Sequence, residues 1–256
     1  RFSKSTGRYK TYTIMKINNS AYIIGETAFH HEGDLDFLDR LVDSFVEHKL
    51  NAIKFHLLLN LDDYFIKEHK AYEFLQKWII KKEDWLKVVK KVHASGIELV
   101  LLCNDPESVD FCIEHNQYIS AIELHATGLN DFFLLNKSLK FEGTIILGVG
   151  GSSIEEIDYA VNFLKKNGKD DILLMYGFQN YPTNYKDVNF SRMLKIKDLF
   201  QLPMGYADHT DPENENNELI RALPILYGVN VLEKHFTIEY PSKRIDHQAA
   251  ISIDRI

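Results

Sequence analysis

Short apolar runs recur along most of this chain, and more polar segments separate them. The runs are nearly continuous in apolar character, which is typical of strands buried on both faces of a parallel sheet. They occupy residues 21–29, 52–59, 97–104, 121–127, 144–150, 171–178, 203–209 and 231–237. The pattern therefore predicts about eight short strands.

The segments between the runs carry apolar residues at helical spacing. In residues 34–50 the apolar side chains recur every three or four positions, and Asp34 is placed to cap the first turn. Ser152 and Ser153 open the best-marked helix, and Gly168 ends it. Further helices are expected near residues 83–94, 107–115, 131–137, 190–200 and 215–226.

Regular alternation of strands and helices over this length predicts a (β/α)8 TIM barrel. An open doubly wound sheet is the alternative, although the first strand-to-helix turn lacks the GxGxxG of a dinucleotide-binding fold. The pattern stops where an eighth, closing helix is due. We therefore expect residues 21–256 to be the barrel domain of a longer chain, unless another subunit covers the gap. Residues 1–20 are a polar lead-in, with a small strand or hairpin at residues 11–18 as one option.

Residues 60–80 interrupt the alternation with a segment rich in aromatic and charged side chains. Insertions that follow a strand often cover a binding site. A solvated helix explains the segment equally well.

Composition narrows the function classes. The chain has 256 residues, 45% of them hydrophobic, and a net charge of −7, which argues against a nucleic-acid-binding protein. Its two cysteines, Cys103 and Cys112, provide no disulfide framework, so a reducing, cytoplasmic location is expected. No apolar run approaches the roughly 20 residues of a membrane span, so no membrane association is expected.

Two histidines end successive apolar runs near the C-terminus. His209 and His235 are separated by about one helix, and the ends of successive strands meet at one rim of a barrel. Two imidazoles at that rim can converge on a metal ion. Each histidine by itself is equally well explained as a structural residue at a strand end, but Asp208, Glu233 and Lys234 beside them favour a site.

A series of short motifs resembles the barrel domain of the sialic acid synthase family, which makes N-acetylneuraminate, legionaminate and pseudaminate. The match runs from about residue 23 onward. GETAFHHEGD resembles AEIGxNHxGD, AIKF is the second-strand motif, PESVDF resembles LESVDF, NYPTNYKDVN resembles NYPTPYEDVN, GYADHT resembles GYSDHT, EKHFT is identical, and IDHQAAIS resembles PDHKASLE.

The resemblance implies an enzyme of bacterial surface-glycan biosynthesis that condenses phosphoenolpyruvate with an acylated amino sugar. It implies a divalent metal, usually Mn²⁺, with Zn²⁺ and Mg²⁺ as alternatives, at His209 and His235. Glu26 matches an acidic residue near that metal, and Lys54 matches a lysine that pairs with phosphoenolpyruvate. Asp246 and Tyr181 match residues of the sugar site. A homodimer and a small C-terminal domain are further expectations.

Several residues depart from the family's pattern. Glu123 and Ala126 stand where the KIxSG motif has the lysine and serine that hold phosphoenolpyruvate, and Ala207 replaces the serine of GYSDH. A carboxylate in place of a lysine repels an anion, so we expect an eroded phosphoenolpyruvate site. Gly150 and Ser152, before a helix, offer a replacement anion-binding turn, with an ordinary helix cap as the alternative.

Two histidines are gains relative to that pattern. His56 replaces a glutamine after AIKF, and His125 lies on the altered fourth strand. Alternation along a strand places Lys54 with His56, and Glu123 with His125, on the face toward the barrel interior. We therefore expect Glu26, Lys54, Glu123 and His125 as catalytic residues and His56 as a substrate-binding residue.

Three functional hypotheses follow. The first is a synthase that uses phosphoenolpyruvate, and the second is a changed bond-forming, bond-breaking or epimerising reaction on a sugar carbonyl compound. The third is a catalytically inactive barrel that serves as a binding or scaffold domain. The metal ligands and the new histidines favour an enzyme.

Overall fold

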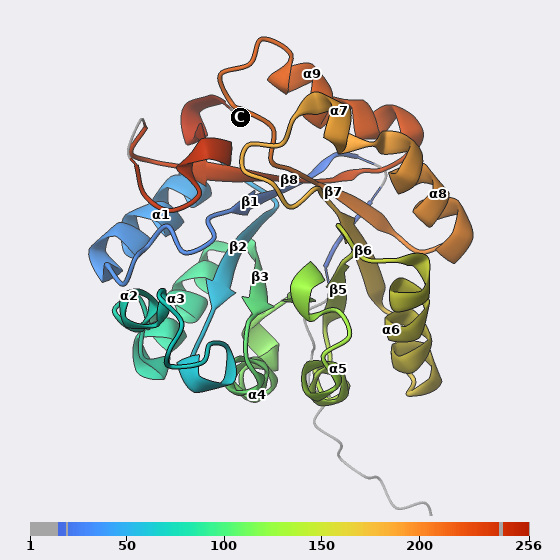
Figure 1. Cartoon of the computed structure of the whole chain (residues 1–256). Helices are drawn as coiled ribbons and strands as arrows, with labels where there is room; N and C mark the ends of the chain where they lie inside the picture. Colours follow the sequence, from blue (N-terminus) through green and yellow to red (C-terminus); the bar gives the residue numbers. More distant parts are fainter. Residues whose placement is uncertain (1–14, 19, 241–242, 256) are drawn as a thin grey trace, which may run out of the picture.

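Eight parallel strands close on themselves in the computed structural model, which describes residues 15–18, 20–240 and 243–255. Neighbouring strands pair in sequence order, and β1 pairs with β8 (Figure 1). The (β/α)8 barrel is therefore confirmed, and the open sheet is wrong. The strands are β1 (Tyr22–Glu26), β2 (Ala52–Leu57), β3 (Glu98–Cys103), β4 (Ala121–Leu124), β5 (Thr144–Gly148), β6 (Ile172–Tyr176), β7 (Met204–Asp208) and β8 (Val231–Thr237).

Helices surround the barrel and are antiparallel to the strands they follow. They are α1 (Leu35–Glu47), α2 (Tyr72–Gln76), α3 (Lys82–Ser95), α4 (Pro106–Glu114), α5 (Phe132–Ser138), α6 (Ile154–Lys166), α7 (Tyr185–Val188), α8 (Phe190–Phe200) and α9 (Asn217–Ala222). None of the helices in the described part of the chain is long and apolar enough to span a membrane.

Local chemistry sets the helix ends. Asp34 caps α1 by accepting a hydrogen bond from the amide of Phe37, and Ser153 forms a capping box with Glu156 at the start of α6. The helix expected at residues 215–226 is shorter, because Pro224 lacks an amide N–H. The chain there continues as a 3₁₀ turn, Leu223–Tyr227.

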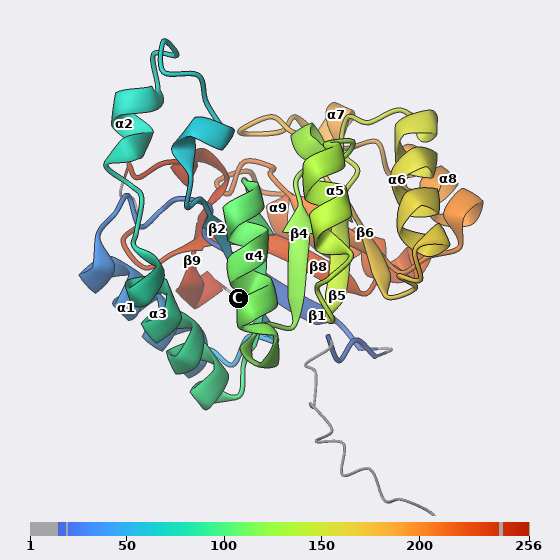
Figure 2. The ribbon, with the colours of Figure 1, turned by 90° about the horizontal axis from the view of Figure 1, so that it is seen from below.

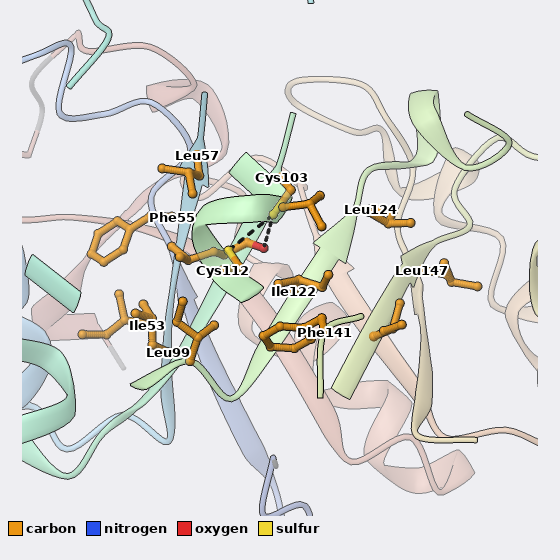
Figure 3. Close-up of a cluster of buried hydrophobic side chains, with 14 of the residues drawn as sticks. Ile53, Phe55, Leu57, Leu99, Cys103, Cys112, Ile122, Leu124, Phe141 and Leu147 are labelled. Atoms are coloured by element: carbon orange, nitrogen blue, oxygen red, sulfur yellow. Dashed lines mark hydrogen bonds between the residues drawn. The ribbon is translucent and has the colours of Figure 1, made fainter. Parts of the chain in front are cut away.

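Apolar side chains form two layers around the strands. Outward-facing residues pack under the helices, and Figure 3 shows part of this layer around Phe55 and Leu99. Cys103 and Cys112 lie here with their sulfurs 3.7 Å apart, buried and not bonded as a disulfide. Inward-facing residues form a second cluster inside the barrel. The polar residues between them, such as Lys54 and His56, are thereby turned toward the interior.

The N-terminal lead-in meets the inner layer. The predicted strand or hairpin at residues 11–18 falls mostly outside the described residues, and residues 15–18 form no strand. Met15 is nevertheless buried in the inner cluster, and its amide donates a hydrogen bond to Thr144 Oγ1.

No α-helix follows β8 in residues 238–240 and 243–255, where a short strand, β9 (Ile251–Ser252), pairs with β8 instead. The outer faces of β1 and β8 border an apolar groove lined by Ile23, Leu232 and Phe236. An eighth helix packs at this position in a complete (β/α)8 barrel.

The segment of residues 60–80 contains α2 and extends from the same end of the barrel as α7 (Figure 2). Its Leu61, Leu75 and Trp78 pack with Phe29 and Ile245, which belong to the loops after β1 and β8. The segment therefore supports the rim loops, and none of its residues lines the hollow described next.

Candidate active site

A polar hollow opens at the C-terminal ends of the strands. This is the face on which barrel enzymes place their active sites. Its polar lining comprises Glu26, Lys54, His56, Glu123, His125, Gln179, Tyr181, His209, Glu233, His235 and Asp246. Nine of the eleven site residues expected from the sequence are thus brought together, and Gly150 and Ser152 are not.

His209, directly after β7, and His235, on β8, lie close together. Their ring centroids are 5.1 Å apart, and the ring of Tyr181 lies 4.7 Å from His209 and 5.9 Å from His235. Nδ1 of His209 is 2.9 Å from the carbonyl oxygen of Phe178, so Nδ1 carries the proton and Nε2 keeps its lone pair. Burial, together with the nearby His235, lowers the pKa of His209 to about 3. This imidazole is therefore neutral.

Glu26 lies between two histidines at the end of β1. Its Oε1 is 3.1 Å from Nε2 of His56 and accepts the amide of Ala28, and its Oε2 is 2.8 Å from Nε2 of His235. Burial raises the pKa of Glu26, but His235 and His56 outweigh burial and hold it well below the usual range. Apart from this contact with His235, Oε2 has no hydrogen-bond partner.

These donors suit a divalent cation only in part. Within the described ranges, no three His, Cys, Asp or Glu side chains are grouped as metal ligands would be. The two imidazoles nevertheless offer nitrogen ligands beside Oε2 of Glu26, whose one close contact is with His235, and nitrogen and carboxylate donors suit manganese or zinc. His209, His235 and Glu26 are therefore the residues that would hold such a cation.

Lys54 lies at the centre of the hollow between two carboxylates. Its Nζ is 2.8 Å from Oε2 of Glu123 and 2.7 Å from Oε1 of Glu233, and all three side chains are buried. Burial lowers the pKa of Lys54, but the two carboxylates outweigh it and raise it overall. Burial raises the pKa of Glu233 to about 7, despite the opposing effect of Lys54. Two carboxylates of the protein therefore already pair with the ammonium.

His125 follows β4 and points into the same hollow as Glu123, as the alternation predicts. Its ring centroid is 6.3 Å from that of His56. Burial lowers the pKa of His125 to about 4, with His56 and Lys54 acting in the same direction. Both gained histidines thus line one site.

Asp246 lines the hollow from the loop after β8, in a left-handed conformation with φ of 61°. Burial raises its pKa, whereas His235 lowers it. Burial likewise raises the pKa of Tyr181.

Gly150 and Ser152, the predicted anion-binding turn, do not line the hollow, and the structure favours the alternative of an ordinary helix cap. The start of α6 is capped by its own side chains, since Ser153 Oγ accepts the amide of Glu156 and the Glu156 carboxylate accepts the amide of Ser153. A Cβ on Gly150 would lie 1.7 Å from the carbonyl oxygen of Gly177, so this glycine permits close packing of two backbones. Gly148 and Gly177 line the hollow instead.

No specific role was predicted for Glu233, Gln179 or His30, although Glu233 was named as one of the residues that favour a site. Glu233 lies two residues before His235, and strand alternation was a sufficient signal for it. Gln179 comes from a loop with no periodic pattern. His30 is fully buried behind the site, and neither ring nitrogen has a hydrogen-bond partner. Lys234 and Asp208 form a buried pair at 2.6 Å beside the metal-ligand candidates.

The closed barrel and a histidine- and carboxylate-lined hollow at its C-terminal face define a TIM-barrel protein with an enzyme-like site. The sequence pattern of the NeuB family matches residues 42–256, and the chain belongs to this family.

Relatives agree with this assignment. An uncharacterized protein of Methanocaldococcus jannaschii is 31% identical over 91% of this chain and 66% of its own length. The N,N'-diacetyllegionaminic acid synthase of Legionella pneumophila is 27% identical over 91% of this chain and 68% of its own length. The chain thus spans about two thirds of these curated relatives.

A solved structure shares the architecture in detail. The N-acetylneuraminic acid synthetase of Leptospira borgpetersenii superposes with a TM-score of 0.84 at 25% identity, covering 94% of this chain and 83% of that one. The expected family and fold are therefore both confirmed.

Proposed function

We propose that this chain is a metal-dependent enzyme of surface-glycan biosynthesis that acts on the carbonyl group of an acylated amino sugar. We further propose that it does not bind phosphoenolpyruvate as synthases of the family do. Membership of the NeuB family and the likeness to legionaminate and N-acetylneuraminate synthases support the sugar substrate. A cytoplasmic location, a homodimer and a further domain remain expectations.

One observation supports the loss of phosphoenolpyruvate binding. Lys54 is the one ammonium or guanidinium group among the described residues that line the hollow, and both Glu123 and Glu233 already pair with it. A phosphate or carboxylate entering here finds no free cation and meets the charge of Glu123. Each lost charge-assisted contact weakens binding by roughly 1.5–3 kcal/mol.

The retained residues support chemistry on a carbonyl. His209 and His235 would hold the metal, which is manganese by family likeness, with zinc and magnesium as alternatives. When bound, it would polarise the sugar carbonyl as a Lewis acid. Glu26 orients His56 and His235, and Tyr181 and Asp246 would contact the sugar at the mouth.

Calorimetry with protein loaded with manganese tests this proposal. We expect manganese to bind the unmodified chain and not the His209→Ala variant, because that variant loses one of two imidazole ligands. Titration of phosphoenolpyruvate into the loaded protein should then give no micromolar binding.

Micromolar binding of phosphoenolpyruvate that His209→Ala abolishes would overturn the proposal in favour of a synthase with a rebuilt anion site. Absence of any manganese, zinc or magnesium binding would favour an inactive barrel with a binding or scaffold role.

A further inference from the structure

His56 is held as a proton acceptor at the edge of the hollow. Its Nε2 lies 3.1 Å from Oε1 of Glu26, whose side chain is only 2% exposed. A carboxylate favours a proton on the nitrogen that faces it, so the lone pair is left on Nδ1. No hydrogen bond from the described part of the chain reaches Nδ1. A buried carboxylate that fixes the tautomer of an imidazole is the arrangement of a general base.

His125 differs from His56 in that the nitrogen available to a ligand is a donor and not an acceptor. The amide of Thr127 donates to its Nδ1 at 3.2 Å, and Oγ1 of the same threonine lies 2.8 Å away. Nδ1 is therefore an acceptor, and Nε2 carries the proton; the ring also forms a side-chain hydrogen bond with Gln179, which lines the same hollow. Burial keeps the ring neutral, since it lowers the pKa to about 4. A neutral imidazole that presents an N–H is a hydrogen-bond donor suited to a carbonyl oxygen.

The two rings meet edge to face across the same hollow, with centroids 6.3 Å apart. The ring of Phe29 packs against the ring of His56, with centroids 5.0 Å apart, and this contact restricts the orientation of the His56 ring. Both rings line the hollow, so a lone pair on one ring and an N–H on the other are available to a carbonyl compound bound there that has a proton on its α carbon.

We propose that His56 and His125 form a base and donor pair that exchanges the proton on the carbon next to the carbonyl of an acylated 2-amino sugar. This inference rests on the proposed function for the class of substrate. The family motifs that this chain resembles have no histidine at the positions of His56 and His125.

The step balances without any further reactant. Nδ1 of His56 takes the proton from C2, and the C–H electron pair forms the C1–C2 double bond of an enolate. The carbonyl electrons move onto the C1 oxygen, where Nε2–H of His125 donates to the developing charge. Return of a proton from His56 to the same face of C2 restores the aldehyde with its configuration retained, and C2 acquires a solvent proton whenever the His56 proton has exchanged with water.

Exchange with solvent measures this step directly. N-acetyl-D-mannosamine and N-acetyl-D-glucosamine are each incubated with the manganese-loaded protein in deuterated water at neutral pH, and loss of the C2 proton signal is followed by NMR. We expect exchange above the protein-free rate with at least one of the two sugars.

His56→Gln keeps a side-chain amide that can reach Glu26 but has no basic nitrogen. It should slow exchange by about 10²–10⁴-fold, the usual contribution of a general base. His125→Phe keeps a ring but no donor and should slow exchange by roughly a hundredfold. His115→Gln, the same substitution at the far end of α4, is the matched control and should exchange like the unmodified chain.

Circular dichroism of every variant checks that it is folded. Failure of the unmodified chain to exchange either sugar would overturn the inference, and so would exchange unchanged in folded His56→Gln. Neither result bears on phosphoenolpyruvate binding. Calorimetry tests the proposed function separately, so the two proposals can fail independently.

Discussion

At the scale of single residues, the feature that most distinguishes this site is the pairing of Lys54. Three buried side chains, Lys54, Glu123 and Glu233, form contacts shorter than 3 Å, although desolvation of each charge is costly. The arrangement persists because each carboxylate is compensated by the same ammonium. The lysine of an anion site has thereby become part of the internal packing of the barrel.

Replacement of Lys54 tests this view. Lys54→Met leaves two buried carboxylates without a cation and should lower the free energy of unfolding by about 3–5 kcal/mol in urea denaturation. Adding Glu123→Gln and Glu233→Gln should recover much of the loss. Lys87→Met, at a lysine whose side chain is 78% exposed, should change stability by under about 0.5 kcal/mol. Undiminished stability of Lys54→Met would show that the cation is not needed.

At the scale of elements, the loops between strands and helices decide which side chains reach the hollow. Gly150, after β5, lies against the backbone of Gly177, after β6, so that two neighbouring rim loops touch without side chains between them. This contact brings Gly148 and Gly177 to the site while the start of α6 is satisfied by Ser153. The glycine-rich stretch is therefore a packing feature of the rim.

A methyl group at this contact should be poorly tolerated. Gly150→Ala places Cβ 1.7 Å from a carbonyl oxygen and should lower the free energy of unfolding by about 3 kcal/mol, because backbone must move. Gly128→Ala, whose Cβ would have its nearest neighbour at 3.5 Å, serves as the control and should stay within about 0.5 kcal/mol. Equal losses in denaturant unfolding would contradict the role of close packing.

At the scale of the whole molecule, the barrel buries several neutral histidines at one end. Burial lowers the pKa values of His30 and His31 to about 3, with His235 and His56 respectively as further causes. The unfolded chain, in which histidine has a pKa near 6.5, therefore binds more protons than the folded chain below that pH. Their contribution to stability is present above about pH 6.5 and is lost as the pH falls toward 3.

The expected result is a steep acid dependence of stability. The free energy of unfolding should decrease from pH 6.5 to pH 4 by up to about 1.4 kcal/mol per pH unit for each such histidine. His30→Leu should reduce this slope by about that amount, while above pH 7 its difference from the unmodified chain should be constant. Urea denaturation at a series of pH values checks this, and a slope equal to that of the unmodified chain would count against His30.

The sequence by itself determined the barrel and most of the site. Buried parallel strands must be apolar on both faces, so their runs were visible, and alternation within a run placed Lys54 with His56 and Glu123 with His125. Those placements were right because a side chain's face follows from local geometry alone. The same alternation places Glu233, two residues before His235, on the inward face, although only its presence near the site was predicted.

Only the tertiary structure decided what those residues do to one another. Glu123 lies 69 positions from Lys54 in the chain and Glu233 lies 179, and no local pattern reveals that barrel closure makes both pair with one ammonium. The contact of Gly150 with Gly177, which lies 27 positions away in the chain, was likewise not visible in any local pattern. Distances across the barrel depend on how all eight strands close, whereas the face of each strand depends only on its own sequence.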